Sequence, residues 1–170
     1  MKKIFFIILF VTVQCGTQQS LTAPIYQLTK TGTGQKVGSI TVSQAGKEIA
    51  IKIVASNLPP GYHGFHLHET NTLTPSEKDG KIVVGGNAGG HWDPDNTGFH
   101  GGPDGNGHRG DLPQLEVNPD GSVSQTIKNK KITLNDIKGR SLMIHAHPDN
   151  FSDHPEPLGG SGARLYAAPF

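Results

Sequence analysis

Histidines with the spacing of metal ligands are gathered in the middle of this 170-residue chain. Seven of its nine histidines lie between His63 and His145, and two of them, His66 and His68, are two residues apart. On a β-strand this spacing puts both side chains on one face, where two imidazoles can bind one metal ion. The other candidate ligands follow in order: His91, His100, His108, Asp111 and His145.

These side chains divide into two ligand sets if one histidine belongs to both. Four imidazoles suit Cu(II), which favours square-planar or tetragonal nitrogen sites, whereas three imidazoles and one carboxylate suit tetrahedral zinc. His66, His68 and His145 fall in predicted strands, which hold ligand geometry well, and the other candidates fall in a long loop. The residue types and their order therefore predict a copper site and a zinc site in one domain.

The elements that must position these ligands are short strands separated by turns. Lys47–Ala55 is the clearest, because isoleucines alternate with polar or small residues along it. Turn signals at intervals of about ten residues indicate an antiparallel sandwich or barrel. The predicted strands are 23–30, 37–43, 47–55, the stretch around His66 and His68, 115–117, 123–127, 141–147 and 164–168, with a helical turn at 134–137 and a hairpin joining 115–117 to 123–127.

Two loops interrupt this pattern. Residues 69–113 have little apolar periodicity and are rich in Gly, Asp, Asn, Pro and His. A loop of that length in a compact domain is usually functional or disordered. Four of the candidate ligands lie in it, so we expect bound metal to order it. Residues 150–162 form a second irregular loop.

The N-terminus has the composition of a secretory signal. Lys2 and Lys3 precede an apolar run, Ile4 to Val13, that is too short to cross a bilayer, which needs about 20 residues. We therefore expect a signal peptide at 1–15, a short tether at 16–22 and a single domain at 23–170. The chain has 15 basic and 14 acidic residues, and without the two lysines the net charge is −1. This near-neutral balance argues against nucleic acid as a partner.

Cys15 is the only cysteine, so no internal disulfide is possible. Its position after the apolar run is typical of a bacterial lipoprotein, in which a lipid on this cysteine tethers the chain to a membrane. Gln14 stands where such proteins usually have a small residue, and cleavage between Cys15 and Gly16 is the alternative. Both interpretations predict the bacterial cell envelope, in the periplasm, either free or as a membrane-anchored lipoprotein.

Several motifs resemble those of the copper/zinc superoxide dismutases of the bacterial envelope. His63-Gly-Phe-His66-Leu-His68-Glu69 resembles the family's copper signature. The motif Gly-His91-Trp-Asp-Pro, then His100, then His108-Arg-Gly-Asp111-Leu-Pro, is similar to its zinc loop. Ile144-His145, with Asp149 four residues on, resembles the last copper ligand and a supporting carboxylate. Pro157-Leu-Gly-Gly-Ser-Gly-Ala-Arg164 resembles the closing loop with its guiding arginine, and the resemblance runs in order over residues 23–168.

The resemblance implies one copper and one zinc per subunit. It implies copper on His66, His68, His91 and His145, and zinc on His91, His100, His108 and Asp111. His91 would then bridge the metals as an imidazolate, Asp149 would hydrogen-bond His66 and His100, and Arg164 would attract an anion beside the copper. The implied fold is all-β: a single-domain Greek-key β-sandwich or barrel of about eight antiparallel strands with two long metal-site loops.

The chain departs from the family at one clamp. The family usually joins its site loop to the last strand by a disulfide, and by alignment the two positions are Leu73 and Ala167 here. A disulfide typically contributes about 2–4 kcal/mol. We therefore expect this chain to depend more strongly on bound metal for stability. The missing disulfide also removes one restraint on the position of Arg164.

The implied activity is the dismutation of superoxide to oxygen and hydrogen peroxide by a redox-cycling copper, an oxidoreductase reaction that protects the envelope. His91 and Arg164 would be the catalytic residues, superoxide the small-molecule partner, and the subunit a monomer or a homodimer. The alternative is an envelope copper-binding or carrier protein on the same fold, which needs neither a bridge nor Arg164. A copper-only dismutase, a β-sandwich adhesion module and a zinc hydrolase are disfavoured by the complete zinc set.

Overall fold

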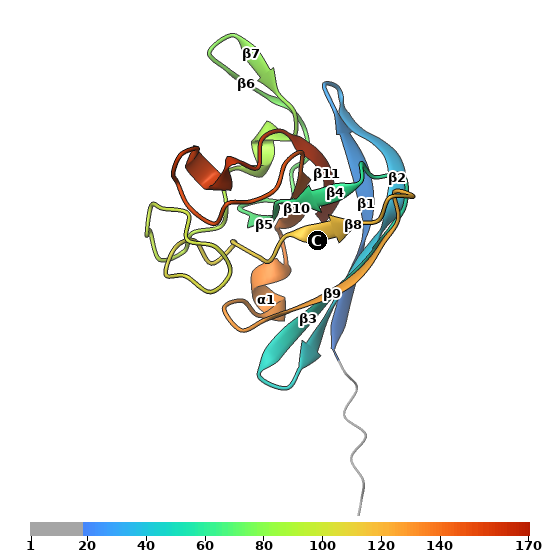
Figure 1. Cartoon of the computed structure of the whole chain (residues 1–170), viewed down its shortest axis with the longest axis vertical. Helices are drawn as coiled ribbons and strands as arrows, with labels where there is room; N and C mark the ends of the chain where they lie inside the picture. Colours follow the sequence, from blue (N-terminus) through green and yellow to red (C-terminus); the bar gives the residue numbers. More distant parts are fainter. Residues whose placement is uncertain (1–18) are drawn as a thin grey trace, which may run out of the picture.

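Seven antiparallel strands form one curled sheet in the computed structural model, which describes residues 19–170 (Figure 1). In order across the sheet they are β5 (Phe65–His68), β10 (Ser141–His145), β11 (Arg164–Pro169), β1 (Ser20–Thr29), β2 (Gly32–Ala45), β3 (Glu48–Ala55) and β9 (Val123–Asn129). Two-stranded ladders join β4 (Gly61–His63) to β8 (Leu115–Val117) and β6 (Ser76–Lys78) to β7 (Lys81–Val83). The short helices are η1 (Gly86–Ala88), α1 (Leu134–Ile137) and η2 (Pro157–Gly160).

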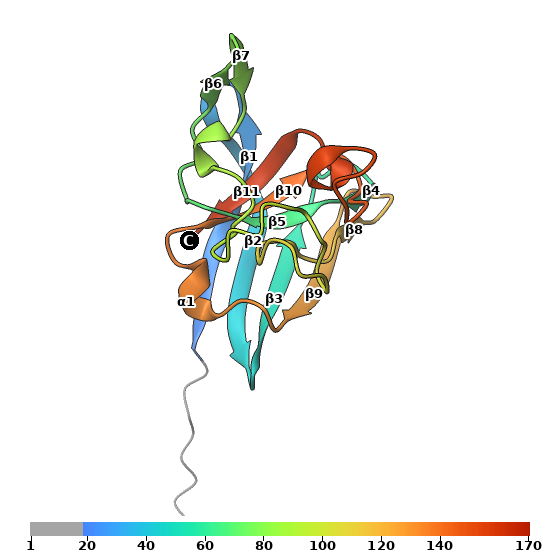
Figure 2. The ribbon, with the colours of Figure 1, turned by 90° about the vertical axis from the view of Figure 1, so that its left-hand side faces the viewer.

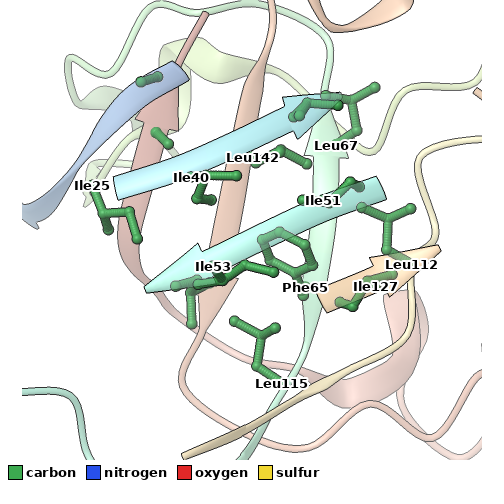
Figure 3. Close-up of a cluster of buried hydrophobic side chains, with 14 of the residues drawn as sticks. Ile25, Ile40, Ile51, Ile53, Phe65, Leu67, Leu112, Leu115, Ile127 and Leu142 are labelled. Atoms are coloured by element: carbon green, nitrogen blue, oxygen red, sulfur yellow. The ribbon is translucent and has the colours of Figure 1, made fainter. Parts of the chain in front are cut away.

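The core lies inside the curl of the sheet, and alternation along each strand builds it. Ile49, Ile51 and Ile53 of β3 are buried, while Lys52 between them faces solvent. Figure 3 shows Ile51 and Ile53 packed with Phe65 of β5 and with side chains from β2, β9 and β10. Because Phe65 and Leu67 point into this core, the period of two turns His66 and His68 to the opposite face of β5.

The all-β prediction is confirmed, and the described residues contain eleven strands rather than about eight. The predicted hairpin at 115–127 is wrong in its pairing. Its turn forms, with Asn118 N–H donating to Ser122 O over 2.9 Å, but β8 pairs with β4 and β9 pairs with β3. The edge of β3 offers β9 seven consecutive partners, which outweighs a three-residue pairing across the turn.

The first strand begins earlier than expected. Ser20–Thr22, the last residues of the predicted tether, already pair with Thr41–Ser43 of β2, and the Thr22 and Thr41 hydroxyls lie 2.9 Å apart. The predicted signal peptide, with Cys15, lies outside the described residues. Among residues 19–170 no helix has the length and apolar character needed to span a membrane.

The long loops lie together on one side of the sheet (Figures 1 and 2), and the β6–β7 hairpin projects from one end of the molecule. The 69–113 segment is not structureless, because β6, β7 and η1 fall within it. Leu73 and Ala167 belong to one small apolar cluster with Leu28, Ala88 and Met143. At the position of the family's disulfide, apolar contact therefore joins the loop to β11.

We expect Leu73→Ala to lower the free energy of unfolding by about 2–3 kcal/mol, since it leaves a cavity beneath the loop. Urea denaturation of the metal-loaded protein measures this. Ile82→Ala is the matched control, because Ile82 is 56% exposed on β7 and its loss is expected to change stability by less than about 0.5 kcal/mol. Equal effects of the two substitutions would show that the small cluster does not hold the loop.

Candidate metal centre

Two loop segments pair with β5 and carry candidate ligands to its polar face. Trp92 N–H donates to Leu67 O over 2.8 Å, and Leu67 N–H donates to Gly110 O over 2.9 Å. These contacts set His91 beside His68 and Asp111 beside His66. The approach is so close that a Cβ on Gly110 would lie 2.3 Å from Leu67 O, so only glycine fits there.

Four imidazoles converge on one side of this arrangement: those of His66, His68, His91 and His145, all buried. One ring nitrogen from each lies within 4.8 Å of the others. The His66 and His91 rings stack with centroids 3.9 Å apart, and the Nε2 atoms of His68 and His145 are separated by 3.3 Å. This all-nitrogen set is the one predicted for copper.

The second set converges on the carboxylate of Asp111, which is fully buried. Its Oδ1 lies 3.0 Å from His91 Nδ1, 3.0 Å from His100 Nδ1 and 3.4 Å from His108 Nδ1. These four residues also have their ligand atoms within 4.8 Å of one another. His91 belongs to both sets, with its Nδ1 on the side of Asp111. Three imidazoles and a carboxylate are the combination predicted for zinc.

Asp149 joins the two sets from behind. Its Oδ2 accepts from His66 Nε2–H over 2.7 Å, and its Oδ1 accepts from His100 Nε2–H over 2.9 Å. It is held in turn by Phe151 N–H, which donates to Oδ1 over 2.7 Å. Because Nε2 of both histidines is engaged with Asp149, each ring turns its Nδ1 toward its own ligand set.

Three of the nitrogens that face the two sets lack a protein hydrogen-bond partner, and this is the observation that fits the sets to metal ions. His66 Nδ1, His100 Nδ1 and His108 Nδ1 are buried without a hydrogen bond; for His100 the short contact to Asp111 is not aligned as one. His68 and His145 use their Nδ1–H to donate to Gly89 O and Gly162 O, so their Nε2 lone pairs face each other. Burying unpaired acceptors in this way is costly unless a cation lies among them.

Electrostatics favour the ligand forms of the all-histidine set and of Asp111. His100 differs: burial lowers its pKa, but its contacts with the carboxylates of Asp111 and Asp149 outweigh burial and raise the pKa to about 9 in the absence of metal. Burial and the neighbouring His66 lower the pKa of His91 to about 3, and burial likewise holds the pKa of His68 and His145 well below the ordinary value. Burial alone would raise the pKa of Asp111, but its contacts with His100 and His91 lower it. Neutral imidazoles and an ionised carboxylate are the species that bind divalent metals.

A cavity of about 230 Å³ opens onto the all-histidine set. Arg164, at the start of β11, lines it, and its guanidinium donates to Gly85 O over 2.7 Å and to Gly89 O over 2.6 Å. Arg164 is thus fixed although the family's disulfide is absent. Gly89 O accepts from both Arg164 and His68, a role that no feature of the sequence reveals. The cavity lining is His68, Gly90, His91, His145, Pro157, Leu158, Gly162 and Arg164.

Other candidates lie outside the centre. Arg109, next to His108 in the sequence, pairs with Asp95 over 2.9 Å and lines a different cavity. The Nδ1 of His63 lies 2.7 Å from His145 O and its Nε2 lies 2.8 Å from Pro59 O, so both ring nitrogens of His63 contact backbone carbonyls. Trp92 packs in the core, with the guanidinium carbon of Arg140 4.5 Å from its ring centroid. His147 and His154 are exposed.

Comparison with known proteins agrees with this geometry. The family model described as copper/zinc superoxide dismutase (SODC) matches residues 36–169. The "Superoxide dismutase [Cu-Zn]" of Brucella abortus is 51% identical over 148 residues, which is 86% of each chain. Among solved structures, the Cu/Zn superoxide dismutase from B. abortus has a TM-score of 0.86 at 49% identity, covering 89% of this chain and 99% of its own. The monomeric copper, zinc enzyme from Salmonella enterica has a TM-score of 0.80 at 40% identity, with the same coverage.

We expect removal of both metals to lower the melting temperature by at least about 8 °C, because ions bound only by the folded state stabilise it in proportion to their affinity. Calorimetry of the dialysed protein with and without Cu²⁺ and Zn²⁺ measures the shift. The single tryptophan, Trp92, adjoins His91 and reports ion binding by its fluorescence. An unchanged melting temperature would contradict the assignment of the unpaired nitrogens to metal.

Proposed function

The chain belongs to the copper/zinc superoxide dismutase family, and from that premise we propose which of its residues carry each part of the reaction. Two superoxide anions and two protons become oxygen and hydrogen peroxide. When bound, copper supplies the one-electron chemistry, and zinc supplies the charge that holds the shared histidine. We assign copper to His66, His68, His91 and His145, and zinc to His91, His100, His108 and Asp111. The convergence of unpaired nitrogens carries this assignment.

His91 is the proposed proton carrier. Its Nδ1 faces Asp111 in the zinc set, which leaves Nε2 for the copper set and for the cavity beyond it. Nε2 can therefore take up a proton and deliver it to the second substrate anion without movement of the backbone. Burial keeps the pKa of His91 low in the absence of metal, so the ring is neutral there. Because the reaction consumes two protons, the proton that Nε2 delivers must be drawn from solvent.

Arg164 is the proposed anion guide. Its two carbonyl contacts fix the guanidinium in the cavity wall beside His68, and no other lysine or arginine lines this cavity in the described chain. The only substrate requirement is a small anion, which a fixed positive charge in a narrow mouth attracts and orients. Asp149 acts through the histidines, by fixing which nitrogen of His66 and His100 faces its metal.

Export to the periplasm of a bacterial envelope is proposed from residues 1–15, whose order of charge and apolar run is that of a signal peptide. A lipid on Cys15 would add a membrane tether. The relatives compared above come from bacteria, and the Salmonella enterica enzyme is described as monomeric, which supports a monomer here. The copper-carrier alternative shares the copper ligands but gives no role to the fixed guanidinium of Arg164.

We expect the copper- and zinc-loaded protein to remove superoxide near the diffusion limit, and copper removal to abolish this. Arg164→Met is expected to lower the rate constant at low ionic strength at least tenfold, within the tenfold-to-thousandfold range known for steered enzymes, this family among them. Arg109→Met is the matched control, because its guanidinium lies in another cavity. Pulse radiolysis measures both. Full metal content with slow decay would instead favour the carrier.

The mass of the mature protein is expected to distinguish the two fates of Cys15. A chain beginning at Cys15 and carrying acyl groups identifies the lipoprotein, and a chain beginning at Gly16 or later identifies simple cleavage. Intact-mass spectrometry of membrane and soluble fractions makes the measurement, and a Cys15→Ser variant provides the unlipidated reference. A mature chain that retains Met1 would contradict export through a cleaved signal.

A further inference from the structure

Lys131 makes three hydrogen bonds to the loop that carries the zinc ligands. Its Nζ donates to Gly105 O over 3.1 Å, to Gly102 O over 3.3 Å and to His108 O over 3.3 Å. A lysine ammonium has three donors and no acceptor, so this set of carbonyls satisfies it completely. All three acceptors lie within one seven-residue stretch that ends at His108.

That stretch has little of its own to hold it in shape. Residues 101–107 contain four glycines and no apolar side chain except Pro103. The backbone folds back on itself so tightly that a Cβ on Gly105 would lie 2.0 Å from Gly101 O, and one on Gly107 would lie 2.4 Å from Gly101 N. Ordering such a glycine-rich turn carries a large entropic cost, and its converging carbonyls repel one another without a donor between them.

Lys131 is itself anchored to the sheet. It is the second residue after the end of β9, and Asn129 Oδ1 accepts from the backbone N–H of Lys131 over 2.7 Å and of Ile132 over 3.0 Å. Asn129 is buried at the end of β9, where it pairs with Ile49 of β3, and Ile132 packs in the core. The backbone of Lys131 is therefore fixed to the sheet, and its side chain ties the loop to that point.

We propose that Lys131 is a positioning residue for the zinc set: its ammonium binds the carbonyls of Gly102, Gly105 and His108 and thereby holds His108 beside Asp111. The inference rests on the proposed function, because it takes His108 as a zinc ligand. Lys131 belongs to neither ligand set and does not line the cavity beside the all-histidine set. It substitutes a charge-assisted clamp for the apolar core that this loop lacks.

The neighbouring lysine provides a matched control. Lys130 lies one residue away, but its Nζ lies 3.3 Å from Glu48 Oε1 and its side chain is 80% exposed. Lys130→Met and Lys131→Met therefore remove the same charge from adjacent positions and leave uncharged side chains of the same length. Only Lys131→Met removes the three hydrogen-bond donors from the loop.

The test measures zinc binding to the metal-free protein at a temperature well below the melting temperature. Competition with a chelator gives the zinc affinity, and the visible absorption of Co²⁺ bound in place of zinc reports the geometry of the site. We expect Lys131→Met to weaken zinc binding roughly tenfold and to perturb the Co²⁺ spectrum, as loss of a group that supports a ligand commonly does. Lys130→Met is expected to stay within twofold of the parent protein.

Equal zinc affinities and identical Co²⁺ spectra in the two variants would overturn the proposal. Failure of the parent protein to bind Co²⁺ with a tetrahedral spectrum would instead overturn the zinc assignment itself, so the two failures are distinguishable. Lys131→Gln, which keeps two N–H donors without the charge, gives the same comparison where the methionine variant does not fold. Hydrogen exchange of residues 101–108 is expected to accelerate in either Lys131 variant and not in the Lys130 variant.

Discussion

The structure depends on one constraint: buried nitrogen lone pairs and a buried carboxylate face one another across two small volumes. Without positive charge between them, these groups would repel and would be unsatisfied. His68 and His145 face each other through Nε2 because their other nitrogens are spent on carbonyls, and Asp149 turns His66 and His100 in the same sense. In each of these rings, the nitrogen that donates a hydrogen bond outward leaves the other nitrogen as an acceptor facing inward. The outer hydrogen bonds therefore define where cations can bind.

Meeting that constraint requires backbone on both sides of β5. The strand supplies two imidazoles on its polar face because Phe65 and Leu67 are fixed in the core on the other. Loop segments at 91–92 and 110–111 then pair with the same strand, so ligands far apart in sequence inherit the precision of a sheet. The loops need little regular structure of their own, since a few backbone hydrogen bonds and buried side chains define their ends.

Much of this arrangement could be predicted from sequence, and the remainder has a common cause. Ligand side chains are distinctive residue types, and alternation in Lys47–Ala55 or the spacing of His66 and His68 follows from the geometry of one strand. The carbonyls of Gly85 and Gly89, which hold Arg164, carry no residue-type signal. The partners of β8 and β9 were mispredicted because the turn between them is local, whereas the edge of β3 is distant in sequence. Lys131 is one lysine among several in a polar segment until the fold brings the loop to it.

Where the family has a disulfide, this chain holds the loop and Arg164 by non-covalent contacts. A covalent clamp acts largely by restricting the unfolded chain, so it stabilises the loop whether or not metal is bound. The cluster of Leu73 and Ala167 and the bonds from Arg164 to Gly85 and Gly89 act only in the folded state. Arg164, the proposed guide for the substrate, therefore also ties down the loop that borders its own cavity. His68 and Arg164 share the Gly89 carbonyl, so the same backbone group contacts a copper-set histidine and the arginine that holds the loop. The contacts that replace the disulfide are therefore part of the site itself.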